Sequence, residues 1–274
     1  MVAEKKVAFI TGIARGQGRA HAVKLASTGM NIVGLDICAD IPSMDYPNAS
    51  EDDLRATAKR VEAAGGEIIA AKGDVRSYDD LRRVLQLGLD RFGRVDALIA
   101  NAGIIRLSPG GDRDRTWSDI IDVNLTGVWR TIEVVLPAIR AGGRGGSIVI
   151  TSSSAGLKGT ASEKAGAQAY TAAKRGLVGL MQVLANEYAG EMIRVNTIHP
   201  TGVVSGMTQN PAMEALIAQA AAGGKNSISQ MQNALPIEIL QPENIADAVA
   251  WLVSDEAAYV TGVQLPLDAG FAVR

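Results

Sequence analysis

The chain has few of the residues that build disulfides, metal sites or strongly charged surfaces. Cys38 is its only cysteine, so no intramolecular disulfide can form, and we expect a reducing cytoplasm as its compartment. His21 and His199 are the only histidines, too few and too far apart in sequence to suggest a metal site. A formal net charge of −2 over 274 residues provides no strong field toward nucleic acid or an anionic membrane. We therefore expect a small-molecule partner, and no metal, nucleic acid or membrane.

Long apolar runs and aromatic residues are also scarce. No apolar run reaches the ~18 residues that a membrane-spanning helix needs, and the first residues pass from a charged start into a strand pattern without a signal-peptide pattern. Aromatic residues make up 4% of the chain, whereas hydrophobic residues make up 47% and glycine occurs 30 times. This composition is typical of a sizeable core with tight turns and close helix–sheet contacts.

Short β-branched runs alternate with longer amphipathic patterns along the whole chain. This alternation predicts parallel strands joined by right-handed crossovers, which is a doubly wound, Rossmann-like α/β sheet of about seven strands with helices on both faces. We find no interior linker or repeat and expect one domain, 1–274. The expected strands are 6–11, 31–36, 67–75, 95–103, 146–154, 193–200 and 263–270, and the expected helices are 17–29, 51–65 with Ser50 as N-cap, 78–92, 115–141, 167–190 and 242–254.

Two segments, 37–50 and 203–241, interrupt this alternation, and each follows the end of an expected strand. Ligands of open α/β sheets bind at the carboxyl ends of the strands, so both segments are candidate walls of one site. The second segment is expected to supply a substrate lid, in which the apolar side chains either contact substrate or form a helix core. These side chains are Met207, Met213, Leu216 and Ile217.

A glycine-rich turn, TGIARGQGR at 11–19, joins the first expected strand to the first helix. Gly12, Gly16 and Gly18 would permit a tight turn and the close approach of a diphosphate to a helix N-terminus. Their spacing, G-x-x-x-G-x-G, differs from the commoner G-x-G-x-x-G, so the turn alone could be purely structural.

Asp36 ends the second expected strand, 24 residues after Gly12. A carboxylate at this place can accept hydrogen bonds from the adenosine ribose hydroxyls and would repel a 2′-phosphate. Arg15, within the glycine turn, could instead contact a 2′-phosphate. We expect NAD over NADP, because a buried carboxylate repels a phosphate directly whereas an arginine can swing away.

Several motifs of the chain together resemble those of one known family. TGIARGQG, GDV (73–75), NAG (101–103), DVNLTG (122–127), SIVITSSSAG (147–156), YTAAK (170–174) and VTG…DAG (260–270) resemble the short-chain dehydrogenase/reductase family, in its order and over nearly the whole chain. GQGRAHAV, SSSAGLKG, HPTGV and the insert 37–50 are similar to the branch of carveol dehydrogenases and mycofactocin-coupled oxidoreductases. That resemblance implies a tightly held NAD that passes its electrons to mycofactocin. The insert would either cover the adenosine half or be an ordinary surface loop.

The resemblance also implies the cofactor contacts. Asp74 and Val75 would flank the adenine, Asn101, Ala102 and Gly103 would line the ribose side, and Pro200, Thr201 and Val203 would meet the nicotinamide. The full expected set is Gly12, Arg15, Gly16, Gln17, Gly18, Asp36, Ile37, Asp74, Val75, Asn101, Ala102, Gly103, Tyr170, Lys174, Pro200, Thr201 and Val203. Two motifs depart from the family pattern. Pro200-Thr201-Gly202 replaces Pro-Gly, which leaves the nicotinamide contacts open, and Asp268-Ala269-Gly270 replaces Asp-Gly-Gly, a change expected to have little consequence.

Tyr170 and Lys174 are four residues apart and therefore share one helix face. Oxidation of a secondary alcohol needs a base, and lowering a tyrosine pKa from ~10 to ~7 takes about 4 kcal/mol at about 1.4 kcal/mol per unit. One ammonium ~4 Å away supplies about 4 kcal/mol at an effective dielectric near 20. The lysine of the family also binds the nicotinamide ribose, so the pair is the expected proton-handling centre.

A serine should polarise the substrate oxygen, and periodicity cannot choose among Ser152, Ser153 and Ser154. The family pattern selects Ser153 and leaves the other two as strand-end residues that bond local backbone. Asn124 lies within the expected helix 115–141, where asparagine is mildly unfavourable. The resemblance implies a local helix irregularity there, at which Asn124 holds a water bonded to Lys174.

These residues predict an NAD-dependent secondary-alcohol dehydrogenase with catalytic Asn124, Ser153, Tyr170 and Lys174. An apolar cyclic alcohol such as carveol is the substrate that the branch suggests. The alternatives are an NADPH-dependent carbonyl reductase, motivated by Arg15, and a non-catalytic NAD-binding sensor or scaffold. The apolar faces of the expected helices 115–141 and 167–190, together with the family habit, predict a homotetramer.

Overall fold

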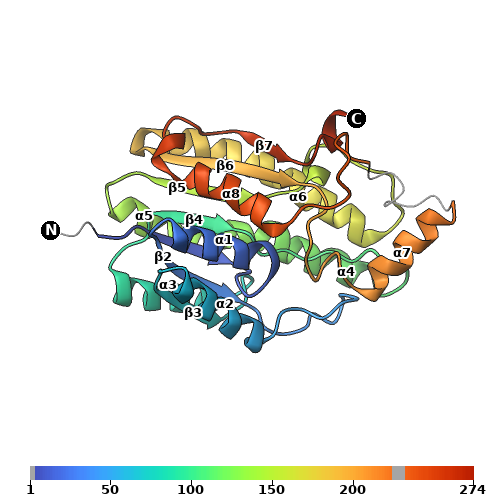
Figure 1. The fold of residues 1–274 in the computed structure, drawn as a ribbon, viewed down its shortest axis with the longest axis horizontal. Helices are drawn as coiled ribbons and strands as arrows, with labels where there is room; N and C mark the ends of the chain where they lie inside the picture. The colour runs from blue at the N-terminus through green and yellow to red at the C-terminus, as the bar shows by residue number, and fades with distance from the viewer. Residues whose placement is uncertain (1–3, 224–231) are drawn as a thin grey trace.

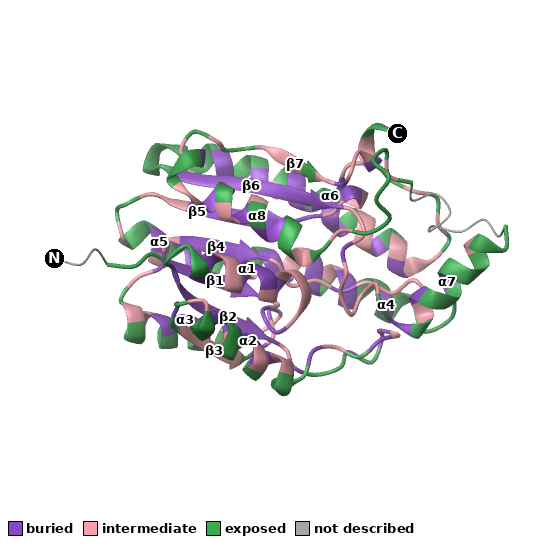
Figure 2. Cartoon of the chain, viewed as in Figure 1, coloured by how far each residue is buried: buried purple, intermediate pink, exposed green. Residues whose placement is uncertain are grey.

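The computed structural model describes residues 4–223 and 232–274 and shows a seven-stranded, all-parallel sheet (Figure 1). The strand order is β3-β2-β1-β4-β5-β6-β7, which confirms the predicted doubly wound class. Strands such as β1 are buried at every position, as expected for a parallel sheet covered on both faces (Figure 2). The strands are Val7–Thr11 (β1), Asn31–Asp36 (β2), Ile68–Lys72 (β3), Ala97–Ala100 (β4), Gly146–Thr151 (β5), Ile193–Pro200 (β6) and Gln264–Leu267 (β7).

Two apolar cores hold the helices to the two faces of the sheet. One core joins the sheet to α3, α5 and α6, and the other joins it to α1, α2 and α8. The helices are Gly16–Ser27 (α1), Glu51–Ala63 (α2), Tyr78–Phe92 (α3), Arg113–Ile121 (α4), Gly127–Ala141 (α5), Ala165–Glu187 (α6), Pro211–Ala221 (α7) and Pro242–Val253 (α8). Ser50 caps α2 as predicted, since its hydroxyl accepts a hydrogen bond from the amide of Asp53.

Four strands end earlier than the sequence pattern predicts. β3 ends at Lys72, β4 at Ala100, β5 at Thr151 and β7 at Leu267, whereas their patterns run about three residues further. The extra residues leave the sheet because they bind elsewhere. Asn101, for example, donates its side-chain amide to the carbonyl oxygens of Thr11 and Gly12 at 3.1 and 3.3 Å. Turns that the sequence pattern assigned to strands therefore line the carboxyl edge of the sheet.

The prediction of a single helix over 115–141 is wrong in detail. α4 begins at Arg113, and a π-helical turn, Asp122–Thr126, separates it from α5. The side chain of Asn124 accepts from the amide of Ile104 and donates to its carbonyl, both at 2.8 Å. These two bonds tie the turn to the segment after β4, and they account for the irregularity that the resemblance implies at Asn124.

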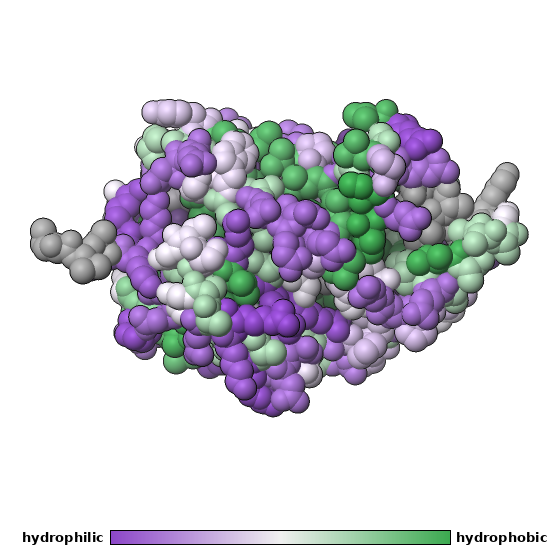
Figure 3. Space-filling model, viewed as in Figure 1, coloured by the Kyte–Doolittle hydropathy of each residue, from purple (hydrophilic) through white to green (hydrophobic). Residues whose placement is uncertain are grey.

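The segment 203–241 leaves the sheet after β6 and contains α7, whose N-cap is Asn210. Part of this expected lid, 224–231, lies outside the described residues. Exposed apolar side chains gather on the face between the body of the molecule and α7 (Figure 3), and Leu235 and Ile237 of this segment are among the exposed ones. Among the residues that the structure describes, no helix is long and apolar enough to cross a membrane. In the same ranges no cluster of His, Cys, Asp or Glu could hold a metal ion.

Candidate active site

Two adjoining cavities open at the carboxyl edge of the sheet. A narrow cleft of about 160 Å³ lies between the glycine turn, the ends of β2, β3 and β4, and the insert 37–50. A wide cavity of about 940 Å³ lies between the ends of β5 and β6, α6 and the segment 203–241. Gln17, Asn101, Gly103, Ser205 and Met207 line both, so the two cavities form one continuous site.

Most of the predicted site residues line these cavities. The narrow cleft is lined by Gly12, Arg15, Gly16, Gln17, Asp36, Ile37, Asp74, Val75, Asn101, Ala102 and Gly103. The wide cavity is lined by Ser153, Tyr170, Lys174, Pro200, Thr201 and Val203. Gly18 and Asn124 line neither cavity.

Gly18 has a packing function within the glycine turn. A Cβ atom there would lie 2.0 Å from the carbonyl oxygen of Gly12, so any side chain would push the turn apart. Gly12 itself has φ +67°, and a Cβ on it would lie 2.9 Å from Cα of Ala102. The turn is thus pressed against the end of β4, and this leaves the N-terminus of α1 open to the cleft.

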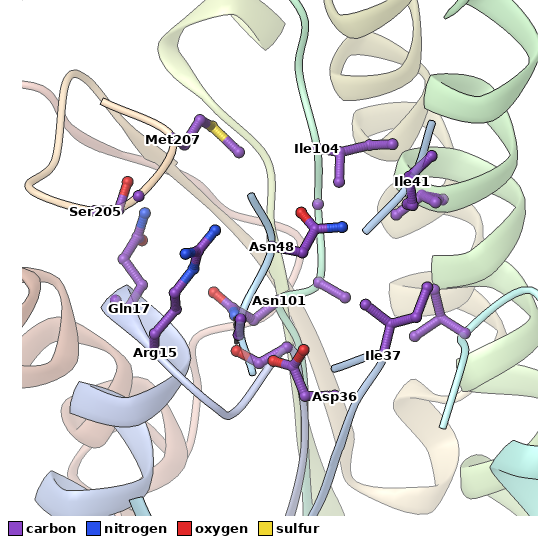
Figure 4. Close-up of a pocket in the computed structure, with 18 of the residues that line it drawn as sticks. Arg15, Gln17, Asp36, Ile37, Ile41, Asn48, Asn101, Ile104, Ser205 and Met207 are labelled. Atoms are coloured by element: carbon purple, nitrogen blue, oxygen red, sulfur yellow. Dashed lines mark hydrogen bonds between the residues drawn. The ribbon is translucent and has the colours of Figure 1, made fainter. Parts of the chain in front are cut away.

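Asp36 lies at the floor of the narrow cleft with 8% of its surface exposed (Figure 4). Its Oδ2 accepts from the amide of Ala14 at 2.9 Å and its Oδ1 from the amide of Cys38 at 3.3 Å. Burial raises the pKa of this carboxyl, while those amides and the charge of Arg15 oppose the rise. A carboxylate has about four lone-pair sites, more than the neighbouring amides use, so Asp36 can still accept from a ligand hydroxyl.

Arg15 points across the mouth of the cleft toward the insert. Its Nη2 donates to the carbonyl oxygen of Pro47 at 2.7 Å. A Cβ on Gly206 would lie 2.5 Å from the guanidinium carbon, so this side chain also packs on the segment after β6. Arg15 therefore links the insert to the beginning of the expected lid.

The insert 37–50 is a built wall of the cleft and not an ordinary surface loop. Ile41, Met44, Tyr46 and Ala49 are all buried. Ile41, Tyr46, Asn48 and Ala49 line the narrow cleft, and Figure 4 shows Ile37, Ile41 and Ile104 on the side opposite Arg15 and Gln17. The sequence predicted the insert as a candidate wall, but not these individual residues, because ICADIPSMDYPNA has no period that marks its buried side chains.

The insert is also bonded to the segment 104–108 that follows β4. The amide of Ile105 donates to the hydroxyl of Tyr46 at 3.2 Å, and the amide of Ser108 donates to Oδ2 of Asp45 at 3.0 Å. Arg106 donates from Nη1 to the carbonyl of Ser43 at 3.0 Å. Because Ile104 lines the narrow cleft and Ile105 the wide cavity, the insert supports the walls of both.

Tyr170 and Lys174 lie on one face of α6, as predicted. The ammonium of Lys174 is 5.6 Å from the ring centroid of Tyr170 and donates to the carbonyl oxygen of Thr151 at 2.6 Å. Burial lowers the pKa of Lys174 to about 7 and raises the pKa of Tyr170, so it favours the neutral form of both groups. This desolvation opposes the attraction of the lysine charge for a tyrosinate, and it cannot be read from the spacing of the pair in sequence.

Ser153 is the serine that faces Tyr170. A hydrogen bond from its side chain lowers the pKa of Tyr170, opposing the effect of burial. Its Oγ also accepts from the amide of Ala155 at 3.2 Å. Ser152 has another function than the expected local bond, because its hydroxyl donates to the carbonyl of Lys174 at 2.8 Å and so ties β5 to α6.

Asn124 is fully buried near Lys174. A Cβ built on Gly103 would lie 3.4 Å from Oδ1 of Asn124 and 3.5 Å from Nζ of Lys174. Both groups therefore approach the same point of the segment after β4, and glycine at 103 leaves the space between them open.

The lid residues divide into two groups. Met207, Met213 and Ile217 line the wide cavity. Leu216 is buried and does not line it, so this residue belongs to the packing of α7. The two expectations for these side chains, substrate wall and helix core, thus apply to different members of the set.

The residues present fit a dinucleotide. The turn presents a helix N-terminus and close-packed glycines, and Asp36 offers acceptors at the floor. Oε1 of Gln17 is buried where the two cavities meet and has no partner among residues 4–223 and 232–274. The length of the combined site runs from the insert to Ser153 and Tyr170. A bound dinucleotide would have its adenosine end in the narrow cleft and its other end beside the wide cavity.

Comparisons with known proteins agree with this geometry. The family model for short chain dehydrogenases matches residues 6–215. An uncharacterised oxidoreductase of Mycobacterium tuberculosis is 52% identical over 98% of this chain and 96% of its own length. The (−)-trans-carveol dehydrogenase of Rhodococcus erythropolis is 42% identical over 99% of both chains. The crystal structure of carveol dehydrogenase from Mycobacterium avium in complex with NAD matches with a TM-score of 0.90 at 42% identity, covering 98% of each chain. The chain belongs to the short chain dehydrogenase family, as its motifs predict.

Proposed function

We propose that this chain is an NAD-dependent dehydrogenase of secondary alcohols. The observation that carries the proposal is the position of Ser153, Tyr170 and Lys174 on the wall of the wide cavity, directly beside the cleft that ends at Asp36. The relative of known structure was solved in complex with NAD, which supports the same cofactor here.

The chain would hold NAD through its two cavities. Asp36 would bind the adenosine ribose, Asp74 and Val75 would flank the adenine, and the amides at the start of α1 would face the diphosphate. Lys174, Pro200, Thr201 and Val203 would contact the nicotinamide riboside. When bound, NAD supplies the acceptor for the hydride that leaves the alcohol carbon.

The proton of the alcohol is handled by the chain itself. Oη of Tyr170 takes it while the hydroxyl of Ser153 holds the alcohol oxygen in place. Burial opposes the tyrosinate that this step needs, so the hydrogen bond from Ser153 and the charge of Lys174 must offset it. Asn124 holds the segment after β4 beside Lys174 through its two bonds to Ile104. We propose that it relays the proton from Lys174 toward solvent.

The wide cavity supports an apolar cyclic alcohol as substrate. Its walls include Ile105, Leu107, Met213, Ile237 and Phe271 around the few polar groups near Tyr170. Two relatives are named as carveol dehydrogenases. Carveol is an apolar cyclic alcohol, which suits a cavity with this apolar lining. We therefore propose carveol or a similar cyclic alcohol as the first compound to test.

We further propose that the chain holds NAD tightly and passes the electrons to mycofactocin. The insert 37–50 is buried against the narrow cleft, and Arg15 bridges it to the segment after β6, so release of the dinucleotide requires both to move. We expect turnover of alcohol with an artificial electron acceptor and little accumulation of free NADH. Ready accumulation of NADH in bulk solution would contradict tight retention.

Tyr170→Phe tests the catalytic assignment. The substitution removes only the hydroxyl, so NAD binding should stay nearly unchanged while turnover of alcohol falls by about a hundredfold or more. Binding is measured by calorimetry and turnover with the artificial acceptor. Turnover that persists in Tyr170→Phe would refute the proposal. Wild-type protein that binds NAD but oxidises no alcohol would favour the sensor or scaffold.

Asp36→Ala tests the choice between NAD and NADP. Wild-type protein should bind NAD more tightly than NADP because Asp36 repels a 2′-phosphate, and Asp36→Ala should narrow that difference at least tenfold. Arg15 already donates to Pro47, which argues against its serving a 2′-phosphate. Tighter binding of NADP by wild-type protein would favour the carbonyl reductase instead.

We also propose that the chain works as a cytoplasmic homotetramer. Trp117 of α4 and Trp129 of α5 each expose 42% of their surface, which is unusual for tryptophan and fits a contact between copies. Trp117→Glu and Trp129→Glu should dissociate the assembly in light scattering. A monomeric wild-type chain would contradict this assembly.

A further inference from the structure

His199 is a buried histidine at the end of β6 that the reaction described above does not use. It lies directly before Pro200 and has no exposed surface. Its Nδ1 is 2.8 Å from the carbonyl oxygen of Ser153, and its Nε2 is 2.9 Å from Oγ1 of Thr197. Both ring nitrogens are therefore engaged, one of them with the serine that faces Tyr170.

The contacts of His199 define its tautomer. A carbonyl oxygen can only accept a hydrogen bond, so Nδ1 must carry the proton that it donates to Ser153. Burial lowers the pKa of His199, which keeps the ring neutral, so Nε2 is unprotonated and accepts from the hydroxyl of Thr197. The charged groups that face the ring are Lys174 and Arg175 of α6 and Asp268 beyond β7.

This bond extends the pairing of β5 and β6 beyond the place where their backbone ladder ends. The last ladder bond runs from the amide of Ser152 to the carbonyl of Ile198 at 2.9 Å. Pro200 has no amide hydrogen, so the backbone of β6 offers no further donor toward Ser153. The imidazole of His199 instead donates to the carbonyl of Ser153, two residues beyond the end of β5 at Thr151.

We propose that His199 is a positioning residue that fixes the backbone of Ser153 and thereby the direction of its hydroxyl at Tyr170. The carbonyl of Ser153 is held between the ring of His199 and the amide of Gly156, which donates to it at 2.8 Å. Loss of the imidazole donor leaves only the bond from the local turn. The inference rests on the proposed function, because it assigns Ser153 and Tyr170 to the reacting pair.

Two substitutions test the contributions of the two ring nitrogens separately. In His199→Asn the side-chain amide nitrogen takes the position of Nδ1 and can still donate to Ser153. In His199→Gln the amide reaches the position of Nε2 and loses Ser153. With carveol and the artificial acceptor, we expect kcat to fall about tenfold to a hundredfold in His199→Gln and less than about threefold in His199→Asn. KM for NAD should stay unchanged in both, because His199 lines neither cavity.

The pH profile supplies a readout that a merely structural histidine would not move. The hydrogen bond from Ser153 lowers the pKa of Tyr170. Its loss in His199→Gln and in Ser153→Ala should raise the pKa below which kcat for alcohol oxidation falls, whereas His199→Asn should leave that pKa unchanged. Equal effects of the two His199 variants, or an unshifted profile in His199→Gln with reduced kcat, would overturn the inference.

Two further measurements need no turnover, so they decide the inference even if the chain oxidises no alcohol. In protein with 13C-labelled tyrosine, the Cζ resonance of Tyr170, assigned through Tyr170→Phe, should move in His199→Gln and stay in His199→Asn. In unmutated protein with 15N-labelled histidine, His199 should show a protonated Nδ1 and an unprotonated Nε2. The opposite tautomer would overturn the inference without any variant, since Nδ1 could then not donate to Ser153.

Discussion

At the scale of single residues, Ala269 shows a cost that the sequence comparison did not reveal. Its φ is +50°, in the left-handed region that the family glycine occupies without strain. The strain is retained because its carbonyl oxygen accepts from the amides of Ala234 and Leu235, both at 2.9 Å. The sequence gives no sign of this strain, and we expect the alanine to cost some stability.

Ala269→Gly should stabilise the chain by about 0.5–1 kcal/mol, because relief of the left-handed strain exceeds the entropy that glycine adds to the unfolded state. Gly270→Ala is the matched opposite, since its φ is +80° and its Cβ would lie 2.7 Å from Cβ of Ala234. It should destabilise by more than about 1 kcal/mol. Urea unfolding of the two variants measures both changes, and a destabilised Ala269→Gly would contradict the argument.

The residues of the site were predictable where chemistry fixes their spacing. Tyr170 and Lys174 had to share a helix face, and Asp36 had to end a strand. Thr151 and His199 were not predictable as site components, because each contributes a bond to or from the backbone that only the folded arrangement brings within reach. Their side chains carry no periodic signal.

At the scale of elements, the insert 37–50 and the segment 104–108 are bonded to each other and together line the site. Helices and buried strands were predictable from their periods, because each buries a regular face against the sheet. The insert was not, since its irregular backbone has no period and is held by separate bonds from Ser43, Asp45 and Tyr46. The π-helical turn at Asn124 was predictable only through resemblance, because its cause is the contact with Ile104 across the fold.

Tyr46→Phe tests this pairing of elements. The substitution removes the acceptor of the partly buried amide of Ile105, and the loss of such a hydrogen bond costs about 0.5–1.5 kcal/mol. Because Ile105 lines the wide cavity, we expect KM for the alcohol to rise about threefold to tenfold, with the affinity for NAD less affected. Tyr259→Phe is the control, since Tyr259 is 95% exposed. A change confined to NAD affinity would mean that the insert serves the cofactor alone.

At the scale of the whole molecule, stability depends on two buried bases on opposite faces of the sheet. His21 of α1 is fully buried, and neither ring nitrogen has a partner in the described structure. Burial lowers the pKa of His21 to about 3 and that of Lys174 to about 7. In each case the unfolded chain binds the proton more tightly, so stability falls as pH drops through the interval between the unfolded and the folded pKa. For Lys174 this interval runs from 10.5 down to about 7, and for His21 from 6.5 down to about 3.

His21→Leu should flatten the acid side of the stability profile of the protein free of NAD. Between pH 7 and pH 5 the wild-type chain should lose about 2 kcal/mol through His21, since each pKa unit corresponds to about 1.4 kcal/mol. The depressed carboxyl pKa values, such as those of Asp53 and Asp119, act only below this window. Urea unfolding at half-unit steps of pH measures the slope in both proteins. Lys174→Met is the complementary control, because it should remove the slope above pH 7 and leave the acid side as in wild type. Burial also lowers the pKa of His199, so this second histidine gives both proteins a common acid slope. An acid slope as steep in His21→Leu as in wild type would show that the ring of His21 is not neutral in the folded chain.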